Sequence, residues 1–314
     1  MIKLNPDYST TRLVTREKPV IEELPDATFK TVLFLPEGEE RQGEGGLRTQ
    51  GCFKRNLPDK PLITVITVVF NGAEHLEETI LSVIDQTYDN VEYIIIDGGS
   101  TDGTLDIIRQ YEHAVDYWVS EKDGGIYDAM NKGISLAFGK IIGLINSDDW
   151  YELSTLSEIA NNNEVDKYIF HGDMNIYKDG EYYYTQIFPG RFNSIKKGMI
   201  LSHPAMFVGR NVYKKYGCFD TSYRVAADWD LALRLYRAGC TFLYAKKIFS
   251  NFRIGGISYQ VDFKSSLEKS AIRKNNNLFS YIDRYLLIDC IKISILGSNV
   301  SLFSLFKRKF SSRL

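Results

Sequence analysis

Cysteine and histidine are scarce in this 314-residue chain, and neither is clustered. The four cysteines lie at positions 52, 218, 240 and 290 without any CxxC pair, and the four histidines are far apart. A structural zinc site needs such ligands at short, regular spacings, so the sequence argues against one. We expect free thiols, as in a protein of the reducing cytoplasm.

An excess of one charge and a long apolar run are also missing. The chain has 38 Lys and Arg against 40 Asp and Glu, a net charge of -2. Nucleic-acid binding needs a basic surface field, so no nucleic-acid partner is predicted. No uncharged apolar run reaches the roughly 18 residues that span a bilayer. The first ten residues also lack the apolar stretch of a signal peptide. We expect a cytoplasmic protein.

The two commonest nucleotide-binding motifs are absent. No GxGxxG follows an apolar run, and no GxxxxGK[ST] occurs. These glycine patterns let the backbone approach a dinucleotide or cradle a triphosphate, so their absence disfavours both kinds of site. A nucleotide site in this chain would have to be built from other side chains.

Short apolar runs that alternate with amphipathic segments are plentiful. We expect strands at 62–70, 91–97, 117–120 and 141–146, and helices at 74–86, 104–111 and 126–138. This alternation predicts an α/β fold with a mostly parallel sheet covered by helices on both faces. Beyond Trp150 the pattern is mixed, with strands expected at 168–173, 181–188 and 205–209 and helices at 211–216, 229–238 and, as a pair, within 263–296.

The two ends of the chain differ in character from its middle. Residues 1–60 form an N-terminal extension in which 37–51 are rich in glycine and charge, so we expect a loop or mobile arm there. Residues 27–35 have the composition of a short strand laid against the main domain. The main domain covers 61–260, and 261–314 form a C-terminal helical segment.

Polar residues follow the predicted parallel strands where each strand ends. Asn71, Asp97, Asp123 and the Asn146–Asp149 stretch occupy these positions. Any one of them alone is explained by a turn or a helix cap. Ligands of open parallel sheets bind beyond the carboxyl ends of the strands, so four such sequences point to a site. Asp148 and Asp149 are placed to hold Mg²⁺ or Mn²⁺, with phosphate oxygens completing the shell.

Five motifs in order carry a resemblance to a known family. They read VITVVFNG, YIIIDGGSTDGT, SEKDGGIYDAMNKGI, GLINSDDWY and AADWDLALRLYRAG, within residues 61–260. As a set they are similar to family 2 of the inverting glycosyltransferases. The resemblance implies a GT-A fold and transfer of a sugar from a nucleotide-diphosphate donor to an acceptor hydroxyl.

The resemblance also implies roles for individual residues. Those expected to bind the nucleotide sugar are Val69, Asn71, Asp97, Ser100, Asp123, Asn131, Lys132, Asn146 and Asp148. The family's metal motif, Asp-x-Asp-Asp, reads Asn146-Ser147-Asp148-Asp149 here, so Asp148 matches the metal ligand and an amide replaces the first carboxylate. Asp102 is expected to shape the loop after the second strand.

The expected catalytic base lies before a helix. The family pattern Glu-Asp-x-Asp-Leu corresponds to Ala227-Asp228-Trp229-Asp230-Leu231, so Asp228 matches the base. The alternative role for Asp228 is a plain helix N-cap. Asp230 is spaced to form an exposed ion pair with Arg234 one turn later.

Two further segments have both a functional and a structural explanation. His203 and the stretch Arg253, Gly255 and Gly256 are expected to contact the acceptor or the donor diphosphate, or else to form simple turns. Residues 285–314 carry five basic residues and no acid after Asp289. Such a tail suits either peripheral contact with the inner membrane, where a lipid-linked sugar acceptor of polysaccharide synthesis would lie, or packing on the domain.

The sequence was also compared with two other functions. A nucleotidyltransferase on a similar sheet would need a basic, glycine-rich loop after the first strand, and the stretch after Phe70 has none. A non-catalytic protein that binds nucleotide sugars on the same fold is the second alternative, because Asn146 and Ala227 depart from the family pattern.

Overall fold

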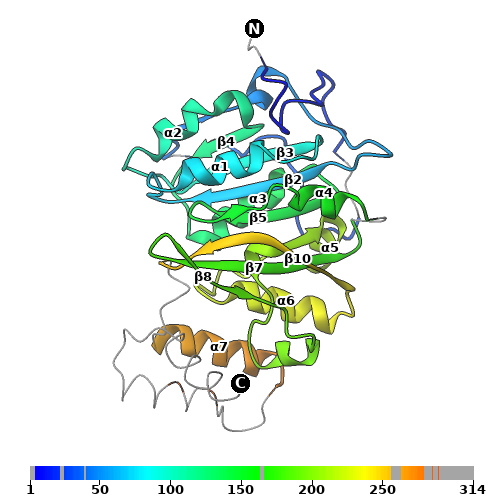
Figure 1. The fold of residues 1–314 in the computed structure, drawn as a ribbon, viewed down its shortest axis with the longest axis vertical. Coiled ribbons are helices and arrows are strands. Elements are labelled where there is room, and N and C mark those ends of the chain that lie inside the picture. Colours follow the sequence, from blue (N-terminus) through cyan, green and yellow to red (C-terminus); the bar gives the residue numbers. More distant parts are fainter. Residues whose placement is uncertain are drawn as a thin grey trace.

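The computed structural model describes residues 4–21, 25–38, 40–162, 166–255 and 263–278, together with Tyr285 and Asp289. In these residues one sheet of ten strands runs through the molecule, in the order β1-β4-β3-β2-β5-β9-β7-β10-β6, with β8 paired to β7. The N-terminal half of the chain builds one end of this sheet, and the later strands build the other (Figure 1).

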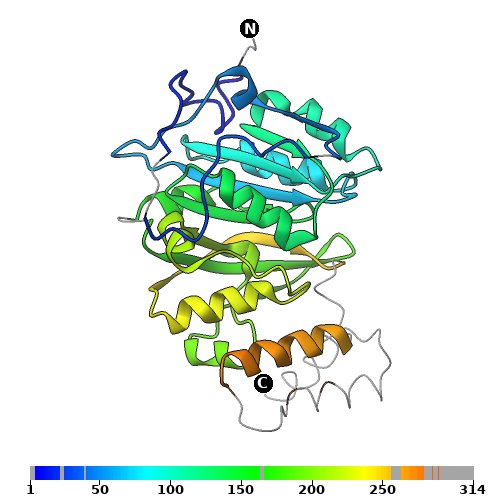
Figure 2. The same ribbon diagram turned by 180° about the vertical axis from the view of Figure 1, so that it is seen from behind.

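Four neighbouring parallel strands form the first half of the sheet. They are β4 (Tyr117–Ser120), β3 (Val91–Asp97), β2 (Ile63–Val69) and β5 (Ile141–Asn146). Helices α1 (Leu76–Ile84) and α2 (Thr104–Gln110) cover one face, and α3 (Ile126–Leu136) covers the other (Figures 1 and 2). The predicted α/β alternation is confirmed, because uniformly apolar runs bury both faces of a parallel strand.

The second half of the sheet mixes strand directions. It contains β9 (Met206–Gly209), β7 (Ile169–Lys178), β8 (Glu181–Gln186), β10 (Phe242–Arg253) and the short β6 (Trp150–Tyr151). Its helices are α4 (Thr155–Ala160), α5 (Arg210–Tyr216), α6 (Ala227–Arg237) and α7 (Phe263–Asn275). Helix α6 lies between the sheet and α7 in both views (Figures 1 and 2). The second of the two helices expected within 263–296 falls outside the described residues.

Strand β10 was not predicted from the sequence. It pairs in parallel with β7, with register shifts between Tyr244 and Ser250, and Lys246 adopts a positive φ of 51°. Its middle residues are exposed. The irregular backbone breaks the alternation of apolar and polar residues, so the pattern that predicts a strand is lost.

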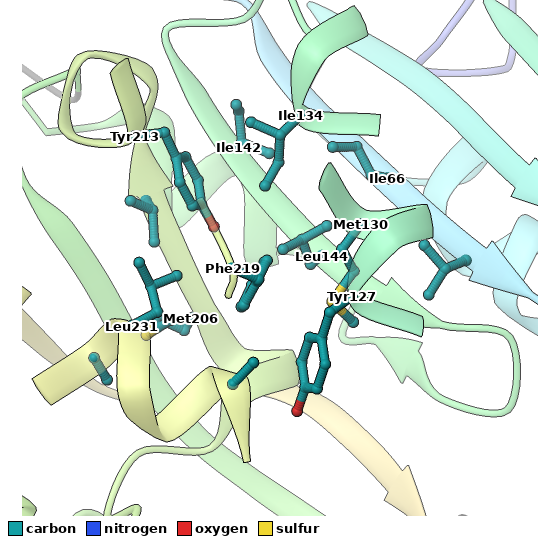
Figure 3. Packing of buried hydrophobic residues seen from close by; sticks show 14 of the residues in the cluster. Ile66, Tyr127, Met130, Ile134, Ile142, Leu144, Met206, Tyr213, Phe219 and Leu231 are labelled. Carbon is teal, nitrogen blue, oxygen red and sulfur yellow. The ribbon is translucent and has the colours of Figure 1, made fainter. Parts of the chain in front are cut away.

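The core that joins the two halves lies between the sheet, α3 and α6. Figure 3 shows Met130 and Tyr127 of α3 near Leu144 of β5, with Phe219 beside them and Leu231 of α6 beyond Phe219. All five side chains are buried. Helix α6 is therefore held against α3 by apolar packing.

The expectation of a loop or mobile arm at residues 37–51 is wrong. Gly43–Gly45 form β1, antiparallel to β4, and Leu47–Gln50 form a 3₁₀ helix. Glycine allows this approach, because a Cβ on Gly45 would come within 2.6 Å of Trp118 Nε1. Arg48, buried in the same segment, pairs with Glu92 of β3 at 2.8 Å. This segment of the extension is an integral edge of the sheet.

The strand expected at residues 27–35 is not observed either. This stretch is irregular but does lie against the domain, since Thr28 N–H donates to Lys214 O and Val32 N–H donates to Ser135 O, both at 2.9 Å. These two isolated backbone hydrogen bonds hold the segment against the domain without forming the continuous hydrogen-bond pattern of a strand. Within the part of the chain that the structure describes, no helix is long and apolar enough to cross a bilayer.

Candidate active site

The carboxyl ends of the parallel strands bring the predicted donor residues into one row. Val69 is paired with Asp97, Asp97 with Ser120, and Ser120 with Gly43 of β1. On the other side of β2, Val68 is paired with Asn146. The four expected strand ends therefore meet at one edge, which is where an open sheet binds ligands.

The loops after β2 and β3 are bound to each other. Asn71, which has a positive φ of 51°, donates its N–H to Ser100 Oγ at 2.7 Å and accepts from Thr101 N–H at 2.9 Å. Asp102 accepts from Ala73 N–H at 3.0 Å. Asp102 therefore ties the two loops together, and these bonds preorganise one wall of the expected donor site.

Asp97 is fully buried beneath this wall. Its carboxylate accepts from the Ser100 hydroxyl and, at 2.5 Å, from the Ser120 hydroxyl, and from the Ser100 N–H at 3.1 Å. A carboxylate with three donors is well satisfied. Asp97 therefore positions Ser100 and Ser120 from below the edge.

Phe70 is an exposed aromatic residue at this edge that the sequence analysis did not single out. Its side chain is 66% exposed, although every residue of β2 before it is buried. The ring lies close to Gly98, where a Cβ would come within 3.4 Å of Phe70 Cδ2. An aromatic residue directly after a buried strand was the available signal. Its exposed face is suited to stacking against a planar base.

Asp123 and Lys132 lie beside the row on the β4 side. The Asp123 carboxylate accepts from Gly125 N–H at 2.8 Å, and burial raises the pKa of Asp123. Lys132 contacts Glu121 at 2.9 Å, and Glu121 is also bound by Arg41 at 2.8 Å. Lys132 is therefore held in an ion-pair network at the mouth of the expected donor site.

Asn131 has a structural partner instead of an open face. Its Nδ2 donates to Phe219 O at 2.9 Å, and its Oδ1 accepts from Phe219 N–H at 3.0 Å. This pair of bonds links α3 to the segment that precedes α6. Asn131 can support the donor site by holding the two halves of the domain together.

The Asn146–Asp149 turn offers one accessible carboxylate and one orphaned oxygen. Asp148 is partly exposed, and burial raises its pKa. Asn146 Oδ1 is buried without a hydrogen-bond partner. These two oxygen donors suit a hard divalent cation that takes its remaining ligands from phosphate. No group of three or more His, Cys, Asp or Glu residues able to hold a metal occurs among the described residues.

Asp149 is placed differently from its neighbour. It is fully buried, accepts from Arg253 N–H at 3.1 Å and from Asn146 Nδ2 at 3.4 Å, and burial raises its pKa well above the usual range. Its oxygens face the backbone of β10 and the Asn146 amide. Asp149 therefore orients Asn146 and anchors the end of β10.

Arg253 lies against the same turn. Its guanidinium donates to Asp148 O at 2.9 Å and pairs with Glu78 at 2.7 Å, and it lies 4.8 Å from the centre of the Trp150 ring. A positive group is thus present beside Asp148. Gly255 has open space around it, and Gly256 lies outside the described residues.

Asp228 is the second residue of α6 and faces α3. Its Oδ1 accepts from Trp229 N–H at 2.7 Å and lies 3.4 Å from the Tyr127 hydroxyl. The cap position belongs to Ala226, so the N-cap explanation for Asp228 does not hold. Among the described residues no donor reaches Asp228 Oδ2. Tyr127 is the second residue of α3, and only the short segment 121–125 separates that helix from the end of β4, so Asp228 lies near the ligand-binding edge of the sheet.

Glu268 of α7 takes over the capping of this region, which the sequence analysis missed. Its carboxylate accepts from the N–H groups of Arg224 and Val225 at 2.9 Å and of Ala226 at 3.3 Å. These are the residues that lead into α6. Glu268 is 40 positions from Asp228 in the sequence, and no local pattern connects them. Helix α7 thus holds the backbone that presents Asp228.

His203 and Asp230 flank the expected base. His203 is half-buried with its ring 5.6 Å from that of Phe219; burial lowers its pKa and the charge of Asp228 opposes this. The predicted ion pair of Asp230 with Arg234 is present at 2.7 Å, but Asp230 is only 8% exposed. The expectation of an exposed pair is therefore wrong, because Arg234 also donates to Cys218 O and draws the pair inward.

A separate cavity of about 430 Å³ lies at the far end of α6. Tyr236 contributes to it, eight residues or about 12 Å along the helix from Asp228. It does not belong to the row of strand ends.

Comparisons with known proteins agree with this geometry. Residues 64–217 match the family described as Glycosyl transferase family 2. An uncharacterized glycosyltransferase of Mycobacterium tuberculosis is 32% identical over 185 residues, which are 57% of this chain and 70% of that protein. A PGL/p-HBAD biosynthesis glycosyltransferase of Mycobacterium bovis is 29% identical over 220 residues, covering 67% of this chain and 84% of the relative.

Two solved structures share the architecture at low sequence identity. Staphylococcus aureus TarS 1–349 in complex with UDP-GlcNAc has a TM-score of 0.55 and 16% identity, covering 75% of this chain and 73% of that one. The mannosyltransferase PcManGT of Pyrobaculum calidifontis, in complex with GDP-Man and Mn²⁺, has a TM-score of 0.52 and 17% identity, with 76% and 71% covered. These likenesses confirm the predicted GT-A architecture.

Proposed function

The chain belongs to glycosyltransferase family 2, and from this premise we propose that it transfers a sugar from a UDP-sugar to a hydroxyl of a bacterial surface glycan, with inversion at the anomeric carbon. The observation that supports this proposal is the position of the Asp228 carboxylate, which lies 3.4 Å from the hydroxyl of Tyr127 near the start of α3, the helix that follows β4. A donor bound along that row would present its sugar to Asp228.

The donor half of the site is the preformed wall of Val69, Asn71 and Ser100 over buried Asp97. Phe70 offers a stacking face for the base, and Asp123 and Lys132 border the cleft. Arg253 provides a positive group near Asp148 for the diphosphate. Asp148 and Asn146 Oδ1 would bind a Mg²⁺ or Mn²⁺ ion, which when present neutralises charge on the leaving diphosphate.

The acceptor half of the site centres on Asp228. Its Oδ2 is the oxygen available to take the proton from the acceptor hydroxyl as that oxygen attacks the anomeric carbon. Attack from the face opposite the diphosphate in a single step inverts the configuration. The Trp229 N–H donates to Oδ1, which fixes the direction of Oδ2. Only one base is required, unlike the carboxylate pair of glycosidases.

The proposed class of acceptor is supported by the names of related proteins and not by the geometry of the site. The Mycobacterium bovis relative is named for PGL/p-HBAD biosynthesis. We extend this to a glycan or lipid-linked sugar acceptor for the present chain. Such an acceptor fits the proposed peripheral contact of the C-terminal segment with the inner membrane; residues 291–314 lie outside the described residues.

The test is a thermal-shift screen of UDP-, GDP- and dTDP-sugars with and without Mn²⁺, followed by an assay of sugar release. A ligand that binds only the folded state adds roughly 2.7 kcal/mol of stability at 100 times Kd. Mn²⁺-dependent stabilisation by a UDP-sugar and slow release of the sugar support the proposal. Binding without any release by wild type would favour the non-catalytic alternative, for which Asn146 and Ala227 are the arguments.

A further inference from the structure

We propose that Gln42, on the N-terminal extension, contacts the base of the nucleotide and sets which base the enzyme prefers. This inference rests on the proposed donor site and adds to it a residue from outside the region that matches the family, which begins at residue 64.

Strand β1 places Gln42 at the ligand-binding edge of the sheet. Gly43 is paired with Ser120, the last residue of β4, and Ser120 is paired with Asp97. Strand β1 is antiparallel to β4. The first residue of β1 therefore lies at the edge of the sheet where the parallel strands end. Gln42 precedes Gly43 and therefore projects beyond the same edge as Asn71 and the loop after Asp97.

The Gln42 side chain reaches back across the edge toward that loop. A Cβ on Gly99 would lie 3.4 Å from Gln42 Nε2 and equally close to Lys122 N. Gly99 precedes Ser100, the residue that holds Asn71. Neighbouring strands are about 4.8 Å apart, so Gly43 is two strand spacings from Asp97, and the glutamine side chain covers most of that gap.

The chemistry of the amide suits a base. The Gln42 side chain is exposed and makes no hydrogen bond to any described residue. A carboxamide has both a donor and an acceptor, which matches the paired N–H and C=O groups on the edge of a nucleobase. Asp97 is buried and already accepts from Ser100 and Ser120. Binding of the base therefore requires another side chain.

The surroundings of Gln42 keep its backbone in place. Its N–H donates to Ser120 O at 2.8 Å. Its neighbour Arg41 pairs with Glu121 at 2.8 Å and with Glu44 at 3.0 Å. Because the backbone at Gln42 is already fixed, less conformational entropy is lost when this segment binds a ligand. The position is therefore suited to selective contact.

The experiment measures the Kd of UDP, CDP and GDP in the presence of Mn²⁺, for wild type, Gln42→Ala, Gln42→Glu and Gln50→Ala. Gln50 is an exposed glutamine of the same extension and is the matched control. We expect Gln42→Ala to reduce the ratio of affinities between the preferred and the other nucleotides at least fivefold. Gln42→Glu, which keeps the acceptor but loses the donor, should change the order of preference. Gln50→Ala should match wild type.

The outcomes separate this inference from the proposed function. If wild type binds none of the three nucleotides, the proposed donor site is wrong and the inference falls with it. If wild type binds selectively and both Gln42 variants weaken all three nucleotides by the same factor, Gln42 only supports the wall and the inference alone is overturned. Melting temperatures of the four proteins show whether each variant is folded.

Discussion

The hydroxyl oxygen of Tyr127 lies 3.4 Å from Oδ1 of Asp228 and joins α3 to the start of α6. The hydroxyl donates its proton to Val225 O at 2.9 Å, and burial raises the pKa of Tyr127 well above its usual range. Tyr127 therefore stays neutral. This contact forms the seam between the donor half and the acceptor half of the site.

Replacing Asp228 by asparagine should abolish transfer while leaving the fold and donor binding intact. The amide is nearly the same size and still accepts from Trp229 N–H, but it cannot take a proton. General base catalysis contributes typically 10²–10⁴-fold, so we expect turnover at saturating donor to fall by about that factor. The checks are turnover, nucleotide Kd and melting temperature. Wild-type turnover would show that the catalytic carboxylate lies elsewhere.

Asp230→Asn is the companion variant on the same helix. Because Asp230 is 8% exposed and bound by Arg234, we expect a loss of stability larger than the roughly 0.3–0.5 kcal/mol of an exposed helical pair. Turnover of the folded protein should stay within a few-fold of wild type. A dead but stable Asp230→Asn enzyme beside an active Asp228→Asn enzyme would reverse the two assignments.

Asp148→Ala should remove the dependence of donor binding on Mn²⁺. Asp148 is the accessible carboxylate of its turn, next to the orphaned Asn146 Oδ1, so the variant has no charged ligand to offer a cation. The measurement is the Kd of UDP with and without Mn²⁺. The contrasting variant is Asp149→Asn, whose buried carboxylate anchors Arg253 N–H; it should lower the melting temperature. An unchanged metal dependence in Asp148→Ala would contradict the assignment.

Glu268→Ala should slow turnover without changing nucleotide affinity. The variant leaves the N–H groups of Arg224, Val225 and Ala226 without their acceptor, and these residues precede the helix that presents Asp228. We expect a lower melting temperature and a reduced kcat with an unaltered UDP Kd. Lys264→Ala, an exposed position on the same helix, is the control. Equal kcat in both variants would mean that α7 does not position the base.

Asp116 should make the stability of the protein fall between about pH 4 and pH 7. Burial raises the pKa of Asp116 to about 7, against an ordinary value near 4, and Lys54, Glu92 and Arg48 are the charged groups around it. In this window the folded state holds a proton that the unfolded state has lost. Its stabilising effect is therefore complete at low pH and disappears as the pH rises through 7.

The test is urea unfolding of wild type and Asp116→Asn from pH 5 to pH 8. The asparagine Oδ1 can still accept from Tyr93 N–H, which the Asp116 carboxylate binds at 2.8 Å. The variant should show a flatter profile, with a difference in slope of at most about 1.4 kcal/mol per pH unit. Exposed Asp106→Asn serves as the control and should follow wild type. Parallel profiles for wild type and Asp116→Asn would refute the shift.

The sequence alone determined the strands and helices of the donor half. The strands at 91–97, 117–120 and 141–146 have the predicted bounds. Short, uniformly apolar, β-branched runs that are bounded by turn residues are typical of buried strands. It also placed Asn71, Asp97 and Asn146 at a common edge, since the carboxyl ends of parallel strands lie together. The motif order then identified the family, as the comparisons confirmed.

Tertiary structure decided the features that depend on distant partners. Within residues 37–51, Gly43–Gly45 form an edge strand because glycine fits against Trp118, and the 3₁₀ helix that follows is held by the ion pair of Arg48 with Glu92. Glu268 caps a helix more than 30 residues before it, and Asp230 is buried because Arg234 turns toward the Cys218 carbonyl. Periodicity and propensity describe neighbours within about one turn or one strand pair. Contacts across 40 residues depend on how whole elements pack, which no local pattern records.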